Sequence, residues 1–318
     1  MNITQINAPK ITDKEWSGVN IYTEDFFFLP RLKNLGKRFL GKVRGPEAVF
    51  RSLIKGLDEL GVGYFVNQHS VPKGAIACVL SGVDTLKRII AQKQAGIFKK
   101  IIAGPNIAIS PNDFGGILKN EAIDAIIVPS GWVKTHYSSE APGIADKIRI
   151  WPAGVQDYGL LANPNGIMRI LFKSGDFNLV DKAYKLGKES GLNPSIIFYG
   201  KFKHQDYLKG LKYTKILVYI SKSESQGLVL HEAWMANVPT LVLDSGIFEY
   251  KGYRLNKNGI SAPYLAPPCG MFFKGAADLE DRLKAMLKNY SAFAPREYSL
   301  RNFTDKASAQ KYLEIINA

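Results

Sequence analysis

The chain has 318 residues, of which 46% are hydrophobic and 22% are charged, with 29 Gly and 16 Pro. This ordinary globular composition excludes an intrinsically disordered chain, a collagen and a disulfide-rich miniprotein, and the length suits about two domains. Lys and Arg outnumber Asp and Glu by 42 to 28, and the net charge of +14 favours an anionic partner: a nucleotide, a phospholipid surface or a nucleic acid.

Neither the N-terminus nor the cysteines indicate export or a structural metal. The sequence MNITQINAPK lacks the basic-then-apolar order of a signal peptide, and no apolar run reaches the roughly eighteen residues of a membrane-spanning helix. Cys78 and Cys269 lie far apart, outside any Cys/His cluster. We therefore expect a cytoplasmic protein without a metal site.

In the first half, short runs rich in Ile, Val, Tyr and Phe alternate with helical patterns, which is typical of βαβ units. The clearest helix covers residues 46–60, where Pro46 suits the first helical turn and Glu47 complements the helix dipole. The predicted strands are 2–7, 63–67, 75–81, 100–104, 125–129 and 148–151.

A stretch rich in Gly, Asn and Pro follows, and we predict a linker at 157–167. A second alternating series then begins. Its predicted strands are 168–173, 195–199, 215–220 and 240–243, and its predicted helices are 179–188, 205–211 and 228–236. The expected fold is α/β, with two doubly wound parallel sheets in domains 1–156 and 168–300 and a final segment at 301–318. Such sheets bind ligands at the carboxyl ends of their strands.

The most informative motif lies between two strands of the second series. The polar loop KSESQG opens the helix LVLHEAWMAN, so that Glu224 lies in the loop and Glu232 lies on the second helical turn. Gly227 permits close backbone approach, and the N–H groups of Gly227, Leu228 and Val229 would face an anion above the helix start. The motif therefore predicts a phosphate cradle with a carboxylate on either side.

This segment resembles the donor-binding motif of retaining GT-B glycosyltransferases, in particular family 4, with its two glutamates in the pattern E-x7-E. AIIVPSGWVKTHY and KIRIWPAGVQD resemble the phrases that close the family's first domain, GMFFKGAADLEDRLKAML resembles its late strand and helix, and FTDKASAQKYLEII resembles its final helix, in the same order. The resemblance implies two Rossmann-like domains that face each other across a cleft. Residues 1–156 would form the acceptor side, residues 168–300 would bind the nucleotide sugar, and residues 301–318 would pack back on the first domain.

The resemblance also implies roles for individual residues. The catalytic residues would be Glu224, which faces the donor sugar and supports its developing positive charge, and Asn106, which occupies the place of a histidine common in the family. Glu232 would accept hydrogen bonds from the ribose hydroxyls. The other residues expected at the donor are Gly45, Lys173, Lys222, Gln226, Gly227, Leu228 and Val229.

The second domain departs from the family at its phosphate clamp. The family has a Gly-Arg pair and a following Lys after the first strand, whereas this chain reads FKSGDFNLVDK, with Asp176 where a base is expected. Lys173, Lys182, Lys201 or Lys222 could substitute, and Lys222 is best placed because it precedes the cradle. A solvated lysine is the alternative for each of them.

The densest positive charge lies before residue 45, next to the aromatic residues Phe26, Phe27 and Phe28. This basic run suits an anionic membrane surface or a phosphate-bearing acceptor, and a solvated loop is the alternative. Its residues are Arg31, Lys33, Lys37, Arg38, Lys42 and Arg44.

These observations predict a retaining glycosyltransferase that moves a sugar from a nucleoside-diphosphate sugar to a glycan, lipid-linked or other hydroxyl acceptor. Because the sequence contains no D-x-D triplet, we expect a metal-independent reaction without a cofactor. The alternative is a catalytically inactive GT-B module that binds a nucleotide sugar or glycan. No nucleic-acid-binding pattern accompanies the charge, so we expect no nucleic-acid partner.

Overall fold

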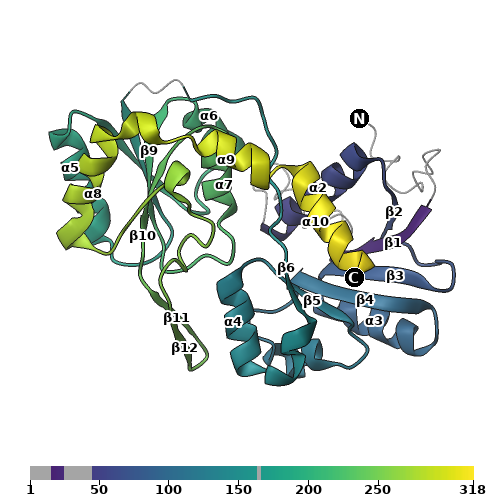
Figure 1. Cartoon of the computed structure of the whole chain (residues 1–318). Coiled ribbons are helices and arrows are strands. Elements are labelled where there is room, and N and C mark those ends of the chain that lie inside the picture. Colours follow the sequence, from purple (N-terminus) through teal and green to yellow (C-terminus); the bar gives the residue numbers. More distant parts are fainter. Residues whose placement is uncertain (1–15, 25–44, 163–165) are drawn as a thin grey trace. The chain divides into compact units, whose positions relative to one another are not determined.

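The computed structural model describes residues 16–24, 45–162 and 166–318, which divide into two compact units (Figure 1). Unit 1 comprises residues 16–24, Gly45–Gly154 and Asp305–Ala318, and unit 2 comprises Val155–Thr304. Two predictions lie outside the described residues: the strand at 2–7 and the basic run of Arg31, Lys33, Lys37, Arg38, Lys42 and Arg44.

Unit 1 is built on a parallel six-stranded sheet in the order β2-β1-β3-β4-β5-β6. The first strand in the described residues, β1, was not predicted from the sequence. The bounds are Trp16–Tyr22 for β1, Gly63–Val66 for β2, Ala75–Ser81 for β3, Phe98–Asn106 for β4, Ala125–Val128 for β5 and Ile148–Ile150 for β6. The five other strands match predicted runs.

Strand β1 escaped prediction because polar and flexible residues interrupt its apolar run. Gly18 has φ +82, and the register with β2 shifts at this point. Asn20 is fully buried, and its Nδ2 donates hydrogen bonds to the carbonyl of Gly18 at 3.2 Å and of Ile76 at 3.3 Å. The Nδ2 group of this buried amide is therefore satisfied in a central strand, because the backbone supplies its acceptors.

The helices of unit 1 include a pair from opposite ends of the sequence. Helix α10 lies along α2, and Figure 1 shows it in yellow beside the dark blue α2. A Cβ atom on Gly56 of α2 would lie 2.1 Å from the carbonyl oxygen of Asp305 in α10, so the backbones approach closely. The helices are α2 (Gly45–Leu60), α3 (Val83–Gln94), α4 (Gly131–Glu140) and α10 (Asp305–Asn317), with short 3-10 turns at Asp113–Gly115, Ile117–Lys119 and Pro142–Lys147.

Further contacts tie α10 to the sheet side of unit 1. The indole Nε1 of Trp151 donates to the carbonyl of Ser308 at 2.9 Å, and the Ser308 hydroxyl donates to the carbonyl of Pro152 at 2.8 Å. The rings of Trp151 and Tyr312 meet edge to face at 4.7 Å between centroids. Both aromatic side chains are fully buried, so α10 is an integral part of this unit.

Unit 2 is built on a parallel five-stranded sheet in the order β13-β10-β9-β7-β8. Together with unit 1, this confirms the prediction of two doubly wound parallel-sheet domains. The strands are β7 (Ile167–Phe172), β8 (Asn193–Phe198), β9 (Thr214–Ile220), β10 (Thr240–Leu243) and β13 (Gly270–Phe273).

The strands of unit 2 are apolar on both faces because helices cover each side. One core cluster joins α5 and α8 to the sheet through residues such as Leu186 and Leu283. The other cluster joins α6 and α7 through residues such as Leu211 and Trp234. The helices are α5 (Asn178–Glu189), α6 (His204–Leu211), α7 (Leu228–Met235), α8 (Ala276–Lys288) and α9 (Pro295–Asn302), with 3-10 turns at Pro267–Cys269 and Tyr290–Ala292.

Two segments of unit 2 differ from a simple alternation of strands and helices. An antiparallel hairpin, β11 (Ile247–Tyr250) and β12 (Tyr253–Asn256), follows β10. Part of the predicted linker packs on α7, because the N–H of Ala162 donates to the carbonyl of Ala236 at 2.9 Å.

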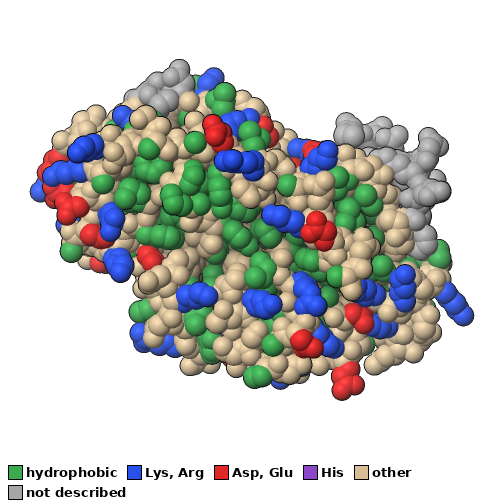
Figure 2. Space-filling view, viewed as in Figure 1, with side chains coloured by type: hydrophobic (Ala, Val, Ile, Leu, Met, Phe, Trp, Pro, Cys, Tyr) green, Lys and Arg blue, Asp and Glu red, His purple; other side chains and the backbone are tan. Residues whose placement is uncertain are grey.

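The positive charge of the described residues is dispersed. On the face shown in Figure 2, Lys and Arg side chains are scattered over both units, with acidic side chains between them. Across residues 16–24, 45–162 and 166–318, no helix is both long and apolar enough to cross a membrane.

Candidate functional site

The loop between β9 and α7 has the geometry of an anion-binding helix start. Gly227, the N-cap of α7, has φ 87 and ψ 53, a left-handed conformation that favours glycine. Within the described part of the chain, no acceptor for the backbone N–H of Leu228 or Val229 is found. The positive end of the helix dipole and these N–H groups can therefore receive a negatively charged group.

Glu224 lies before this helix start and is almost buried, with an exposed fraction of 8%. Its Oε1 accepts a hydrogen bond from the hydroxyl of Tyr219 and lies 2.6 Å from Nζ of Lys173. The hydroxyl of Ser221 lies 3.3 Å from the same oxygen. Because the partners come from β9, from the loop after it and from the residue that follows β7, the carboxylate is held in one position.

The charge partner of Glu224 is also placed by an aromatic ring. Nζ of Lys173 lies 4.7 Å from the centroid of Tyr199, which follows β8. Burial raises the pKa of Tyr219 well above its ordinary value, and the nearby Glu224 carboxylate raises it further, so this phenol stays a donor. The cluster therefore combines one carboxylate, one ammonium and two hydroxyls, those of Tyr219 and Ser221, at the carboxyl edge of the sheet.

Glu232, on the second turn of α7, has a different partner. Its Oε1 lies 2.6 Å from Nε2 of His204, the first residue of α6, and the Glu and His side chains are 11% and 21% exposed. From the same helix, the hydroxyl of Tyr207 donates to the carbonyl of Val229 at 2.6 Å. Burial, and secondarily the Glu232 carboxylate, raise the pKa of Tyr207 well above its usual value. Helix α6 thus contacts both the first turn of α7, through Tyr207, and Glu232 on its second turn, through His204.

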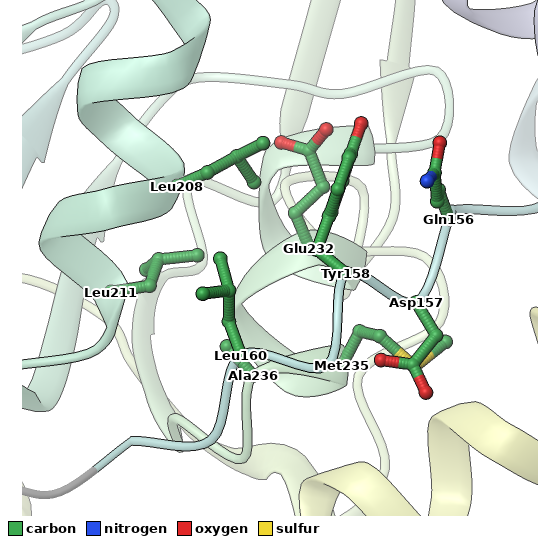
Figure 3. Close-up of a pocket in the computed structure, with 9 residues that line it drawn as sticks. All are labelled: Gln156, Asp157, Tyr158, Leu160, Leu208, Leu211, Glu232, Met235 and Ala236. Atoms are coloured by element: carbon green, nitrogen blue, oxygen red, sulfur yellow. The ribbon is translucent and has the colours of Figure 1, made fainter.

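Glu232 also borders a small pocket of unit 2 (Figure 3). In this view, the side chains of Glu232 and Tyr158 point to the same side, whereas Asp157 turns the other way. Asp157 forms a bidentate ion pair with Arg296, at 3.1 and 2.6 Å. The pocket is lined by Gln156, Asp157, Tyr158, Leu160, Leu208, Leu211, Glu232, Met235 and Ala236.

The remaining predicted site residues of unit 2 lie near the loop. Lys222 is exposed, and its backbone N–H donates to the hydroxyl of Ser174 at 3.0 Å, which joins the loops after β7 and β9. Gln226 is buried directly before Gly227. The structure therefore gathers Lys173, Lys222, Glu224, Gln226, Gly227, Leu228, Val229 and Glu232 along one loop–helix segment and the adjacent end of β7.

The two other predicted residues belong to unit 1. Asn106 ends β4 beside Ser81 of β3, at the carboxyl edge of that sheet. Its Nδ2 is buried, with no hydrogen-bond partner among the described residues. Gly45 is exposed at the first position of α2.

Sequence reasoning missed the residues that hold the glutamates in place: Tyr219, Ser221 and His204. Tyr219 is the next-to-last residue of a buried strand. A tyrosine hydroxyl at the carboxyl end of such a strand is the feature of the sequence that could have identified it as a site residue. His204 carries no signal in the sequence, because only the packing of α6 on α7 brings it to Glu232.

His231, next to Glu232, is a packing residue. Its ring lies 4.2 Å from that of Phe303 and 5.0 Å from that of Trp234, measured between centroids. Neither ring nitrogen has a partner among the described residues. Burial lowers the pKa of His231 to about 3, which keeps the ring neutral.

No family model and no curated protein matches the sequence. Similarity to solved structures is found instead, at low sequence identity. The apo form of the lipopolysaccharide outer core galactosyltransferase WaaB has a TM-score of 0.58 at 11% identity, covering 94% of this chain and 99% of that chain. WaaG, a glycosyltransferase of lipopolysaccharide biosynthesis, has a TM-score of 0.52 at 10% identity, covering 94% and 100%.

A third similar structure contains bound molecules. It is a mutant of TarM from S. aureus in complex with fondaparinux, alpha-GlcNAc-glycerol and UDP, with a TM-score of 0.53 at 14% identity. The alignment covers 85% of this chain and 59% of the TarM chain, so this chain spans little more than half of that protein. Together these similarities show that the chain has the GT-B fold of two Rossmann-like domains.

Proposed function

We propose that this protein is a retaining glycosyltransferase of the family 4 type, which transfers a sugar from a nucleoside-diphosphate sugar to a hydroxyl acceptor. The observation that carries the proposal is the segment from Glu224 to Glu232. It combines an unshielded helix start at a left-handed Gly227 with one carboxylate before the helix and another on its second turn. The GT-B fold of the chain supports the same function by analogy.

In the proposed donor complex, the diphosphate lies over the N–H groups of Gly227, Leu228 and Val229. Negative charge on the leaving diphosphate is met by these N–H groups, by the helix dipole and by Lys173. Lys173 would thus replace the basic residue that Asp176 displaces from the family pattern. We propose that the reaction needs no metal ion, because amides and lysines supply the positive field.

Glu224 would act on the sugar rather than on the nucleotide. Transfer at an anomeric carbon passes through an oxocarbenium-like state with positive charge on the ring. A carboxylate already held by Tyr219 and Lys173 requires little reorganisation to stabilise that charge. Glu232 would accept hydrogen bonds from the ribose hydroxyls.

The acceptor would bind at unit 1, where Asn106 ends β4 at the carboxyl edge of the sheet. Gly45, at the start of α2, would approach the donor diphosphate from this side. We propose a glycan or lipid-linked acceptor, because the basic run of the sequence suits a phosphate-bearing molecule or an anionic membrane surface. The protein would then act in the cytoplasm, with peripheral contact to such a membrane.

The two glutamates give the proposal a discriminating test. UDP, GDP and ADP are first compared by thermal shift, and the best binder is then titrated by calorimetry. Glu232→Ala should weaken nucleotide binding by about tenfold or more, because charge-assisted hydrogen bonds to the ribose are lost. Glu224→Gln should leave nucleotide affinity nearly unchanged while turnover of the nucleotide sugar falls by about a hundredfold or more.

Glu280→Gln is the matched control, since Glu280 is an acid on α8, where it pairs with Lys284 at 2.6 Å. The control should keep both affinity and turnover. Full activity in both site variants would refute the proposed function. Tight nucleotide binding without any donor hydrolysis or transfer would instead indicate the inactive binding module.

A further inference from the structure

The contact between His204 and Glu232 joins two helices at the edge of the proposed donor site. His204 begins α6 and Glu232 lies on α7, and their closest side-chain atoms are 2.6 Å apart. A carboxylate has no hydrogen to donate at neutral pH, so Nε2 of the imidazole is the donor. The contact fixes which Glu232 oxygen faces α6.

His204 is the group that orients this carboxylate, because the other polar side chains around it have other partners. Tyr207 uses its hydroxyl on the carbonyl of Val229. The nearby Arg296 is engaged by Asp157 and by the carbonyl of Met235 at 2.6 Å. Across the described residues, His204 is the only side chain within hydrogen-bond or ion-pair distance of the Glu232 carboxylate.

The following inference rests on the proposed function: we propose that His204 is a positioning residue for ribose recognition. It occupies Oε1 of Glu232, fixes the side-chain rotamer and leaves Oε2 as the acceptor for the ribose hydroxyls. A glutamate on a helix surface otherwise samples several rotamers, and each must be frozen when the ligand binds. A fixed partner removes that cost before binding, as outer-shell partners do for other ligand-holding side chains.

The proposal predicts that replacing His204 removes the preference of the protein for a ribose over a dideoxyribose nucleotide. The probes are the best-binding nucleoside diphosphate among UDP, GDP and ADP and its 2′,3′-dideoxy counterpart, both titrated by calorimetry. The native protein should prefer the ribose form by about tenfold or more. His204→Ala should reduce this ratio to within about threefold of one, with the dideoxy affinity unchanged. His204→Gln, whose amide nitrogen can replace Nε2, should restore the preference.

Glu232→Ala should abolish the preference in the same assay, and His69→Ala, an exposed histidine of unit 1, should leave it intact. If His204→Ala melts below the assay temperature, His204→Asn replaces it, because its shorter amide does not reach Oε1. A native preference that survives in the His204 variants would overturn this inference and leave the proposed function standing. Failure of the native protein to bind any of the three nucleotides would overturn both.

Discussion

Replacing His231 by phenylalanine should remove a pH-dependent weakness from unit 2. The imidazole lies fully buried against the aromatic rings of Trp234, Tyr264 and Phe303, and burial alone lowers its pKa from 6.5 to about 3. The unfolded chain therefore binds a proton at this residue below pH 6.5, whereas the folded chain does not. The contribution of His231 to stability is fully present above pH 6.5 and is lost as the pH falls from 6.5 towards 3.

The size of the effect follows from the distance between the assay pH and the ordinary pKa. At pH 5, which lies about 1.5 pH units below the ordinary pKa, protonation of His231 stabilises the unfolded state by about 2 kcal/mol. At pH 8 the gain is close to zero. Packing changes caused by the larger phenylalanine ring are the same at both values, so comparing the two pH values isolates the proton.

The assay is urea unfolding of the native protein and His231→Phe at pH 8 and pH 5. The difference in unfolding free energy between the two proteins should move by about 2 kcal/mol in favour of the variant at the lower pH. His69→Phe, at an exposed histidine, serves as control and should show no such movement. Parallel pH dependence in the native protein and the His231 variant would refute the reasoning, because it would mean that the buried ring is protonated in the folded state.

Three further substitutions test other parts of the structure. Gly227→Ala places a side chain at φ +87, so we expect about 1 to 2 kcal/mol of lost stability in urea unfolding and weaker nucleotide binding by calorimetry. Lys173→Met removes the ammonium 2.6 Å from Glu224, so turnover should fall. The variant should also lose about 1 to 2 kcal/mol of stability, a moderate amount because the lysine is part-exposed and its ion pair is partly screened by solvent. Gly56→Ala drives a methyl group into the backbone of Asp305 and should cost about 3 kcal/mol or more in thermal or urea unfolding.

Matched controls separate these effects from general perturbation. Lys311→Met removes a charge from an exposed position of α10 and should leave stability and turnover unchanged. Gly143→Ala adds a methyl group with nothing within 4 Å and should be neutral in unfolding experiments. Equal losses in a variant and its control would contradict the explanation given for that variant.

The fold was largely predictable because its strands are buried on both faces. Continuous apolar runs such as residues 75–81 and 240–243 coincide with strands β3 and β10 to the residue. The hairpin β11–β12 was missed because IFEY and YRLN are four-residue segments that mix polar and apolar residues around Lys251-Gly252, without a long apolar run. The prediction succeeded for strands whose burial required continuous apolar runs, and it failed for β1 and the hairpin, whose residues mix polar and apolar side chains.

For the candidate site, the sequence predicted the loop–helix segment but not its supports. The spacing of Glu224, Gly227 and Glu232 is a local pattern, so it can be recognised in one stretch of chain. Their partners Lys173 and His204 come from the end of β7 and the start of α6, which only the folded sheet brings close. A single sequence carries no record of these pairings.

The packing of α10 on α2 determines the order in which the two units can be completed during synthesis. When residues 155–304 have left the ribosome, every strand of the unit 2 sheet is available, but the groove beside Gly56 still lacks its helix. At that moment the indole N–H of Trp151 and Nζ of Lys100 also lack their acceptors, the carbonyls of Ser308 and Ile316. Unit 1 therefore acquires its full native contacts last, although most of its residues are translated first. A chain released before α10 would expose the apolar face of α2 to chaperones and proteases.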